Sequence, residues 1–358
     1  MRSGLVVFAL VLGACDGGRA ATGDAGPGDD DPGVTDALDG SGARDGESAT
    51  DGTAIDAGPD GPTSSDAGTD PTLLSMQGVY GDFAARSIPS DAFTYEVRWE
   101  LWVDGATKRR WLLLPPGGQI DNTDQEHWRF PVGTRQVKEF TRGGTLVETR
   151  IIETLASGTS LRTFVWNAAQ TDAVLMVDGA IDVAGTPHDA PTAHDCMKCH
   201  QSEPGGSLGI SAVQLPPAIL AALSAAGKLR IPIAAGTMFG PTGTPAQVDA
   251  LGYLHGNCGH CHNPGGYAAG TNNMSLRLDA LAKAATSEPG WLTTVGVTVQ
   301  GNGAGAGKRI DPMNPQNSAV VRRMSVRGNY DQMPLVGSEV VHSAGVSTVT
   351  SWVNTIAP

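Results

Sequence analysis

Residues 93–103 read FTYEVRWELWV, and this stretch decides the expected fold of the first half of the chain. Apolar side chains occupy every second position from Phe93 to Val103, and mostly polar side chains fill the positions between them. Side chains alternate between the two faces of a strand, so this period of two predicts a strand that is buried on one face.

Further strands are predicted downstream, where runs of β-branched and aromatic residues are separated by Gly-Gly, Pro-Pro and Ser-Gly pairs. These runs are residues 110–114, 135–140, 145–154, 161–166 and 173–177. The sequence Arg142-Gly143-Gly144-Thr145 predicts a hairpin turn. Strands at this spacing predict a β-sandwich-like domain over 79–185, in which we read no pair of catalytic residues.

After residue 186 the pattern changes to short helices and loops rich in Gly and Pro. Pro216 and Pro217 open a helix that ends at Gly227, Thr244 caps a second helix, and a third begins near Ala344. The predicted fold class is therefore α+β and multidomain, with a mainly α-helical region after the β-rich domain.

The N-terminus has the features of an export signal. An apolar stretch over 5–12 is too short to span a bilayer, and Leu12-Gly13-Ala14 precedes Cys15. Small residues before a cysteine resemble a bacterial lipoprotein signal, in which Cys15 becomes lipidated; the alternative is an ordinary signal peptide. We expect residues 1–15 to be this signal, and the protein to be lipid-anchored in the cell envelope of a Gram-negative bacterium, facing the periplasm or the cell surface.

The formal net charge of -13 comes almost entirely from one segment. Residues 16–72 contain fourteen Asp or Glu and two Arg, with almost no large apolar side chain. Such a composition cannot bury enough surface to fold, so we expect a disordered acidic tether. The remaining chain is nearly neutral and has no basic stripe, and we expect no nucleic-acid partner.

Two pentapeptides share the spacing C-x-x-C-H: Cys196-Met197-Lys198-Cys199-His200 and Cys258-Gly259-His260-Cys261-His262. In a c-type site both thiols bond to the vinyl groups of a porphyrin, and the histidine after the second cysteine coordinates the iron. The two motifs therefore predict two covalently bound haem c groups, with His200 and His262 as iron ligands. We expect a first haem region over 186–243 and a cytochrome c-like second haem domain over 244–358, with His260 facing solvent.

A structural zinc site that pairs the two C-x-x-C units is the main alternative. However, 58 residues separate Cys199 from Cys258, whereas compact zinc ribbons use about 15 to 20. Zinc also gives no reason for a histidine at the same offset in both motifs. A thiol-redox pair is disfavoured because no βαβ pattern surrounds either motif.

The sixth ligand of the second iron is predicted to be Met333, in a Met-Pro loop about seventy residues after His262. A Met/His ligand pair raises the reduction potential of a haem. Met313 and Met324 are alternatives, although the pattern around Met324 favours a place in the core.

The first iron has less clear candidates for its sixth ligand. Met238 is the methionine between the two motifs, and His188 precedes the first motif; both are retained as candidates. A five-coordinate iron, or a ligand such as His255, also remains open.

These residues give the chain a resemblance to bacterial exported di-haem cytochrome c domain-containing lipoproteins with an N-terminal β domain. The resemblance covers roughly residues 80–358. The stretches that carry it are Phe130-Pro131-Val132-Gly133-Thr134, Lys138-Glu139-Phe140, Glu148-Thr149-Arg150, Val165-Trp166-Asn167, Gly185-Thr186-Pro187-His188-Asp189, Leu208-Gly209, Gln214-Leu215, Tyr253-Leu254-His255-Gly256-Asn257-Cys258, Asn263-Pro264-Gly265-Gly266, Pro315-Gln316-Asn317-Ser318, Arg323-Met324, Met333-Pro334 and Trp352. It implies haem binding, electron transfer and a C-terminal module folded like a small class I cytochrome c.

The expected function is electron transfer through two haems to a redox partner protein in the envelope. A haem enzyme with an open first iron, such as a peroxidase or a dehydrogenase subunit, is one alternative. An envelope binding protein with accessory haems is another. The residues do not decide whether the protein is an enzyme, although they favour a carrier.

Overall fold

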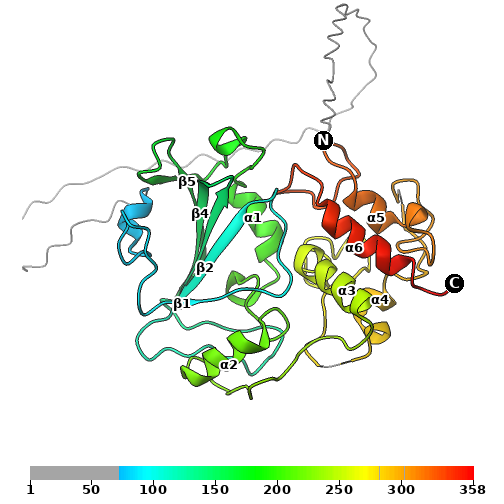
Figure 1. Ribbon diagram of the computed structural model, residues 1–358, viewed down its shortest axis with the longest axis horizontal. Coiled ribbons are helices and arrows are strands. Elements are labelled where there is room, and N and C mark those ends of the chain that lie inside the picture. Colours follow the sequence, from blue (N-terminus) through cyan, green and yellow to red (C-terminus); the bar gives the residue numbers. More distant parts are fainter. Residues whose placement is uncertain (1–71, 282, 302) are drawn as a thin grey trace, which may run out of the picture. The chain divides into compact units, whose positions relative to one another are not determined.

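A computed structural model describes residues 72–281, 283–301 and 303–358, which belong to one compact unit. Its strands form one antiparallel sheet in which each strand pairs with the next along the chain (Figure 1). They are β1 (Phe93–Thr94), β2 (Thr107–Leu113), β3 (Arg135–Arg142), β4 (Thr145–Leu155), β5 (Gly158–Trp166) and β6 (Ala173–Leu175). The described residues contain no second sheet, so the predicted β-sandwich-like domain is wrong.

The helices of the described residues are short. They are α1 (Ala193–His200), α2 (Pro217–Ala225), α3 (Pro245–Cys258), α4 (Pro289–Leu292), α5 (Ala319–Met324) and α6 (Ser343–Val353). The prediction of a mainly α-helical di-haem region with a class I cytochrome c-like module is therefore wrong. Gly and Pro interrupt the chain too often, because both residues disfavour helix interiors. Between residues 265 and 314 the longest helix has four residues.

The turn between β3 and β4 is the predicted hairpin. Gly143 and Gly144 both have positive φ, at 56° and 86°, which two-residue hairpin turns require and which glycine adopts at little cost. The turn pairs Arg142 with Thr145, and the register between β3 and β4 then shifts at a bulge between Phe140 and Thr141. The five strand predictions from residue 110 onward are confirmed as parts of β2 to β6.

The stretch 93–103 mostly departs from its prediction. Only its first two residues pair in the sheet, as β1. Further along, the backbone N–H of Arg98 donates to the Gln214 carbonyl at 2.7 Å, and that of Trp102 donates to Asn257 Oδ1 at 2.8 Å. The alternation therefore comes from packing on both sides of an extended segment rather than from a strand ladder.

The two faces of the sheet differ in chemistry. On one face Trp111, Val137, Ile151 and Phe164 form a dry cluster with Leu74, which comes from the segment before the sheet. The other face is polar over much of its area and faces α1 (Figure 1). A side chain on α1 can therefore meet charged groups of the sheet.

A second core lies among the C-terminal helices, where α3 and α6 pack together. Leu251, Leu254, Val349 and Trp352 are its central side chains. The Thr244 cap of α3 and the last helix, predicted to begin near Ala344, are confirmed. None of the described helices has the length and apolar character needed to cross a bilayer.

Trp99 lies directly against α3, where two glycines make room for it. A Cβ atom added to Gly252 would lie 1.8 Å from Trp99 Cε2, so this position requires a residue without a side chain. We expect Gly252→Ala to lower the free energy of unfolding by about 1–3 kcal/mol, because the ring must shift. Chemical denaturation measures this change.

Gly270→Ala is the matched control, because a Cβ there meets nothing within 4 Å. Equal stability of both variants would contradict the packing of Trp99 on α3.

Glu288 precedes α4 and is fully buried. Its Oε2 accepts a hydrogen bond from the Asp279 N–H at 2.9 Å, whereas Oε1 has no partner among the described residues. Burial raises the pKa of this carboxyl from its usual 4.5 to about 7. Ionisation of Glu288 therefore opposes folding.

Stability is expected to fall as pH rises from 4.5 through about 7, because the folded state binds the Glu288 proton more tightly than the unfolded state. Glu288→Gln should raise the free energy of unfolding at pH 8 by on the order of 2 kcal/mol, with a smaller effect at pH 5. Denaturant titrations at both pH values measure this, with the exposed Glu96→Gln as control. A gain that is independent of pH would count against a buried ionisation.

Candidate cofactor site

The first C-x-x-C-H motif lies on α1. Thr192 caps this helix, accepting a hydrogen bond from the Asp195 N–H at 3.0 Å. At the other end His200 Nδ1 donates to the Gly206 carbonyl at 2.5 Å, which fixes the ring and leaves Nε2 as its basic nitrogen. Burial lowers the pKa of His200 to about 3, so the imidazole is neutral, the form that binds metals.

Cys196 and His200 line a pocket against the polar face of the sheet. Phe140, Ile152 and Leu161 contribute apolar wall. The charged lining consists of Lys108, Arg110, Lys138, Arg150 and Arg162. The first motif thus faces a pocket that combines an apolar wall with basic side chains.

The second motif begins at the last residue of α3 and continues into the following turn. Burial raises the pKa of the Cys258 thiol to about 12 and lowers that of His262 to about 4. His262 is buried, and its Nδ1 has no hydrogen-bond partner among the described residues. The neutral imidazole of His262 is the form that can bind a metal ion.

The two motifs lie against each other, although 58 residues separate them in sequence. Cys261 Sγ donates to the Lys198 carbonyl at 3.3 Å, and Ser202 Oγ donates to the His260 carbonyl at 3.1 Å. Ligand atoms of Cys199, His260 and Cys261 all lie within 4.8 Å of one another. His260 is buried, so the prediction that it faces solvent is wrong.

The thiols of the two motifs also influence each other. A hydrogen bond between Cys199 and Cys261 raises the pKa of Cys199 to about 12 and lowers that of Cys261. Burial raises the pKa of Cys196 as well. Reactive redox thiols have lowered pKa values, so three of the four thiols do not match a thiol-disulfide enzyme.

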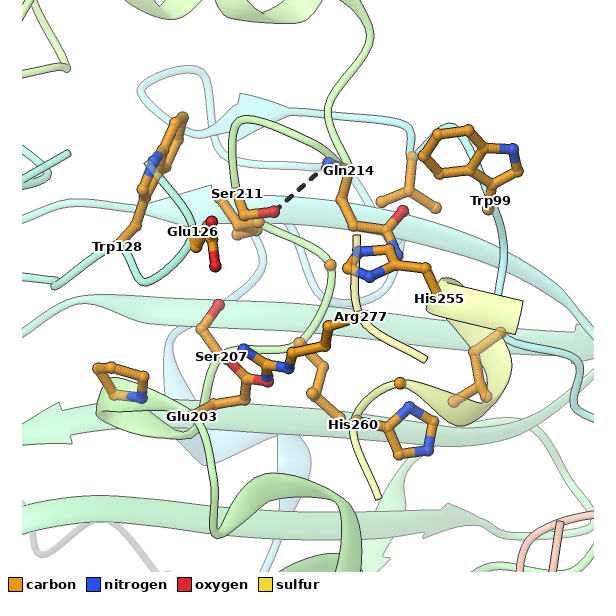
Figure 2. A pocket seen from close by; sticks show the side chains of 18 of the residues that line it. Trp99, Glu126, Trp128, Glu203, Ser207, Ser211, Gln214, His255, His260 and Arg277 are labelled. Atoms are coloured by element: carbon orange, nitrogen blue, oxygen red, sulfur yellow. Dashed lines mark hydrogen bonds and ion pairs between the residues drawn. The ribbon is translucent and has the colours of Figure 1, made fainter. Parts of the chain in front are cut away.

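A second pocket, of about 780 Å³ and open to solvent, lies between the first motif's downstream loop and α3. Figure 2 shows Arg277 reaching toward Glu203, with which it forms an ion pair, and the His255 ring close to Gln214. His260 also lines this pocket. The second motif therefore contributes a side chain to the surroundings of the first.

The candidates for the first iron's sixth ligand occupy different environments. His188 is fully buried, and its Nε2 lies 3.0 Å from Glu148 Oε1, while Nδ1 has no partner among the described residues. Met238 is 59% exposed and lines neither of the two pockets. His255 lines the larger pocket, and its Nδ1 accepts a hydrogen bond from the Leu278 N–H at 3.1 Å.

The Met333 loop is tied to two arginines that act on the second motif. The Met333 N–H donates to the Arg323 carbonyl at 3.0 Å, and Arg327 Nη1 donates to the Met333 carbonyl at 3.2 Å. The charge of Arg323 contributes to lowering the pKa of His262, and that of Arg327 acts on Cys258. The role of Met333 as an iron ligand stays a prediction; Met324 is buried in the helical core, as expected.

The basic side chains of the sheet are the part of the site that the sequence did not indicate. In register, Arg110 lies opposite Lys138, and Lys138 lies opposite Arg150. Burial, together with the neighbouring positive charges, lowers the pKa of Lys138 to about 7. The expectation of no chemistry in the β-rich part overlooked this row. The sequence alone gave no signal for it, because Lys138 lies opposite Arg150 only through the bulge between Phe140 and Thr141.

Cys15, the signal over 1–15 and nearly all of the acidic tether lie outside the described residues. Comparisons with protein families, curated proteins and solved structures gave no match for this chain. The interpretation of the site therefore depends on its own residues.

Proposed function

We propose that this chain is a di-haem c-type cytochrome that transfers electrons in the cell envelope through two covalently attached haems. The observation that carries the proposal is the geometry of His200. The Gly206 carbonyl holds its Nδ1–H, so Nε2 can bind iron beside the two thiols of the same motif. Haem would supply one-electron chemistry, and the chain supplies attachment, ligands and surroundings.

The donor set fits haem c at both motifs. The four described cysteines are free, so each motif offers two thiols. Both proximal histidines are neutral, because burial lowers the pKa of each. The pocket at Cys196 is lined by His200 of the same motif and by apolar and basic side chains of the sheet.

Contact between the motifs supports electron exchange between the two haems. Cys261 and Lys198 are in hydrogen-bond contact across the motifs, so the attachment cysteines of both haems are neighbours. A chain of this kind would accept an electron at one iron and release it from the other to a redox partner protein. We propose a lipid anchor at Cys15 that keeps the protein at the envelope membrane.

A structural metal site is the second candidate function. Cys199, His260 and Cys261 supply three donors within 4.8 Å of one another, a partial set for tetrahedral zinc. This site would use one thiol from one motif and one from the other, and it would leave Cys196 and Cys258 without a role. The repeated histidine at the end of each motif also has no part in it.

The exported protein is expected to contain two c-type haems per chain. The pyridine haemochrome spectrum and the mass of the intact chain measure this number. Replacing Cys196 and Cys199 together by Ala should remove one haem, and replacing Cys258 and Cys261 together should remove the other. A haem-free chain with one equivalent of zinc would refute the proposal and support the metal site.

Met333→Ala is expected to abolish the weak red absorption of a methionine–iron bond and to lower the reduction potential of one haem, because a thioether ligand stabilises the reduced iron. Optical spectra and a redox titration of the oxidised protein measure both effects. Met313→Ala is the control, at an exposed methionine. If only the Met313 change removes the band, the ligand is Met313 and not Met333.

A further inference from the structure

Like charges lie directly opposite each other on the polar face of the sheet. Arg110, Lys138 and Arg150 are in register on β2, β3 and β4, and Lys108 lies on the same face of β2. Cross-strand pairs of equal charge destabilise a sheet, and partial burial strengthens their repulsion. A sheet with this row needs negative charge close to it.

The carboxylates of the described residues supply only part of that charge. Arg110 forms an ion pair with Glu100, and Arg150 forms one with Glu148 at 2.5 Å. Lys108 donates to the Leu101 carbonyl and Lys138 to the Leu208 carbonyl. Neither lysine has a carboxylate partner in the described part of the chain. Arg162, which also lines the pocket, pairs with Glu153, so the two lysines are the basic side chains of this lining without a carboxylate partner among the described residues.

The four basic side chains indicate a ligand, because they line one pocket. All four cations line the pocket between the polar face of the sheet and α1, and so do Cys196 and His200 of the first motif. Arg150 Nε is buried there without a hydrogen-bond partner among the described residues. The Phe140 ring lies 5.7 Å from Lys108 Nζ and 4.7 Å from the Arg150 guanidinium carbon, and it provides an apolar surface beside the charges. The pocket therefore suits a ligand that combines an apolar surface with negative charge.

We propose that Lys108, Arg110, Lys138 and Arg150 bind the two propionate groups of the haem attached at Cys196 and Cys199. This inference rests on the proposed function. Two propionates would give both lysines a carboxylate partner, and basic side chains bind carboxylates with strong, charge-assisted hydrogen bonds. In this arrangement the sheet acts as the electrostatic partner of the first haem, and its charge favours the reduced iron.

Lys138 allows a sharp test, because Lys138→Gln removes the charge but keeps an N–H donor for the Leu208 carbonyl. In the haem-loaded protein this change should lower the reduction potential of one haem. The pH dependence of that potential should also shift to higher pH. A propionate without its cation binds a proton more tightly, so its pKa rises. Redox titrations between pH 5 and 9 measure both shifts, and Lys138→Arg should restore the wild-type values.

Arg135→Gln is the matched control, because Arg135 lies on the same strand at a position of opposite parity and donates to the Gln77 carbonyl. It should leave both potentials unchanged. Lys108→Gln is the second test variant and should shift the same haem in the same direction. It keeps the inference testable if Lys138→Gln does not fold.

The failures of the two proposals are distinguishable. A wild-type protein without haem refutes the proposed function. A protein with two haems whose potentials do not respond to Lys138→Gln or Lys108→Gln refutes only the propionate assignment. Succinate added to the wild-type protein should also leave the potentials unchanged. A response to succinate would indicate that the basic side chains bind a soluble dicarboxylate instead.

Discussion

The side chain of Asn257 is the contact on which the arrangement of the site depends. Its Oδ1 accepts from the Trp102 N–H at 2.8 Å, and its Nδ2 donates to the Glu100 carbonyl at 3.0 Å. It therefore joins the segment that leads into β2 to the end of α3. Because Asn257 precedes Cys258, the same two hydrogen bonds position the second motif. A buried amide with satisfied hydrogen bonds favours one arrangement over its competitors, and the Trp99 ring on Gly252 reinforces that choice.

The first motif is held differently. α1 has eight residues, of which Cys196, Cys199 and His200 are half-buried, and it contributes no side chain to the apolar cores. Its contacts are polar: the Thr192 cap, the His200 bond to Gly206 and the approach of Cys261 to Lys198. A cofactor bonded to Cys196 and Cys199 would add the apolar contact with the sheet that this helix lacks. The basic face of the sheet and the half-buried face of α1 would then be two parts of one binding site.

Local signals predicted much of the secondary structure, because turns and caps depend on neighbouring residues. The Gly143-Gly144 turn and the Thr244 cap are examples, and both were identified from a few positions. The stretch 93–103 shows where such reasoning fails. Its alternation is real, but its hydrogen-bond partners are Gln214 and Asn257, more than a hundred residues away. Alternation indicates two different environments, and it does not identify what provides them.

The residues of the candidate site were predictable, but their assembly was not. The spacing of each motif singled out the thiols and the histidines, whereas the attachment of haem to them stays a prediction. The burial of His260 depends on the approach of two segments 58 residues apart. The row through Arg110, Lys138 and Arg150 depends on strand register, which pattern alone gives only near the hairpin turn. The predictions of a sandwich and of a helical module were wrong for a related reason. The lengths of helices and strands do not determine how many layers they form.

The closeness of Cys199 and Cys261 has a consequence for how the protein matures. Their sulfur atoms belong to different motifs, yet they lie within 4.8 Å of each other in a chain that carries free thiols. In an oxidising compartment, two such thiols are prone to form a disulfide. That bond would take one cysteine from each C-x-x-C-H motif and block both at once. If haem is attached here as proposed, loading with cofactor and oxidation would compete for the same sulfur atoms, and a folded but empty chain would depend on reductant to stay competent.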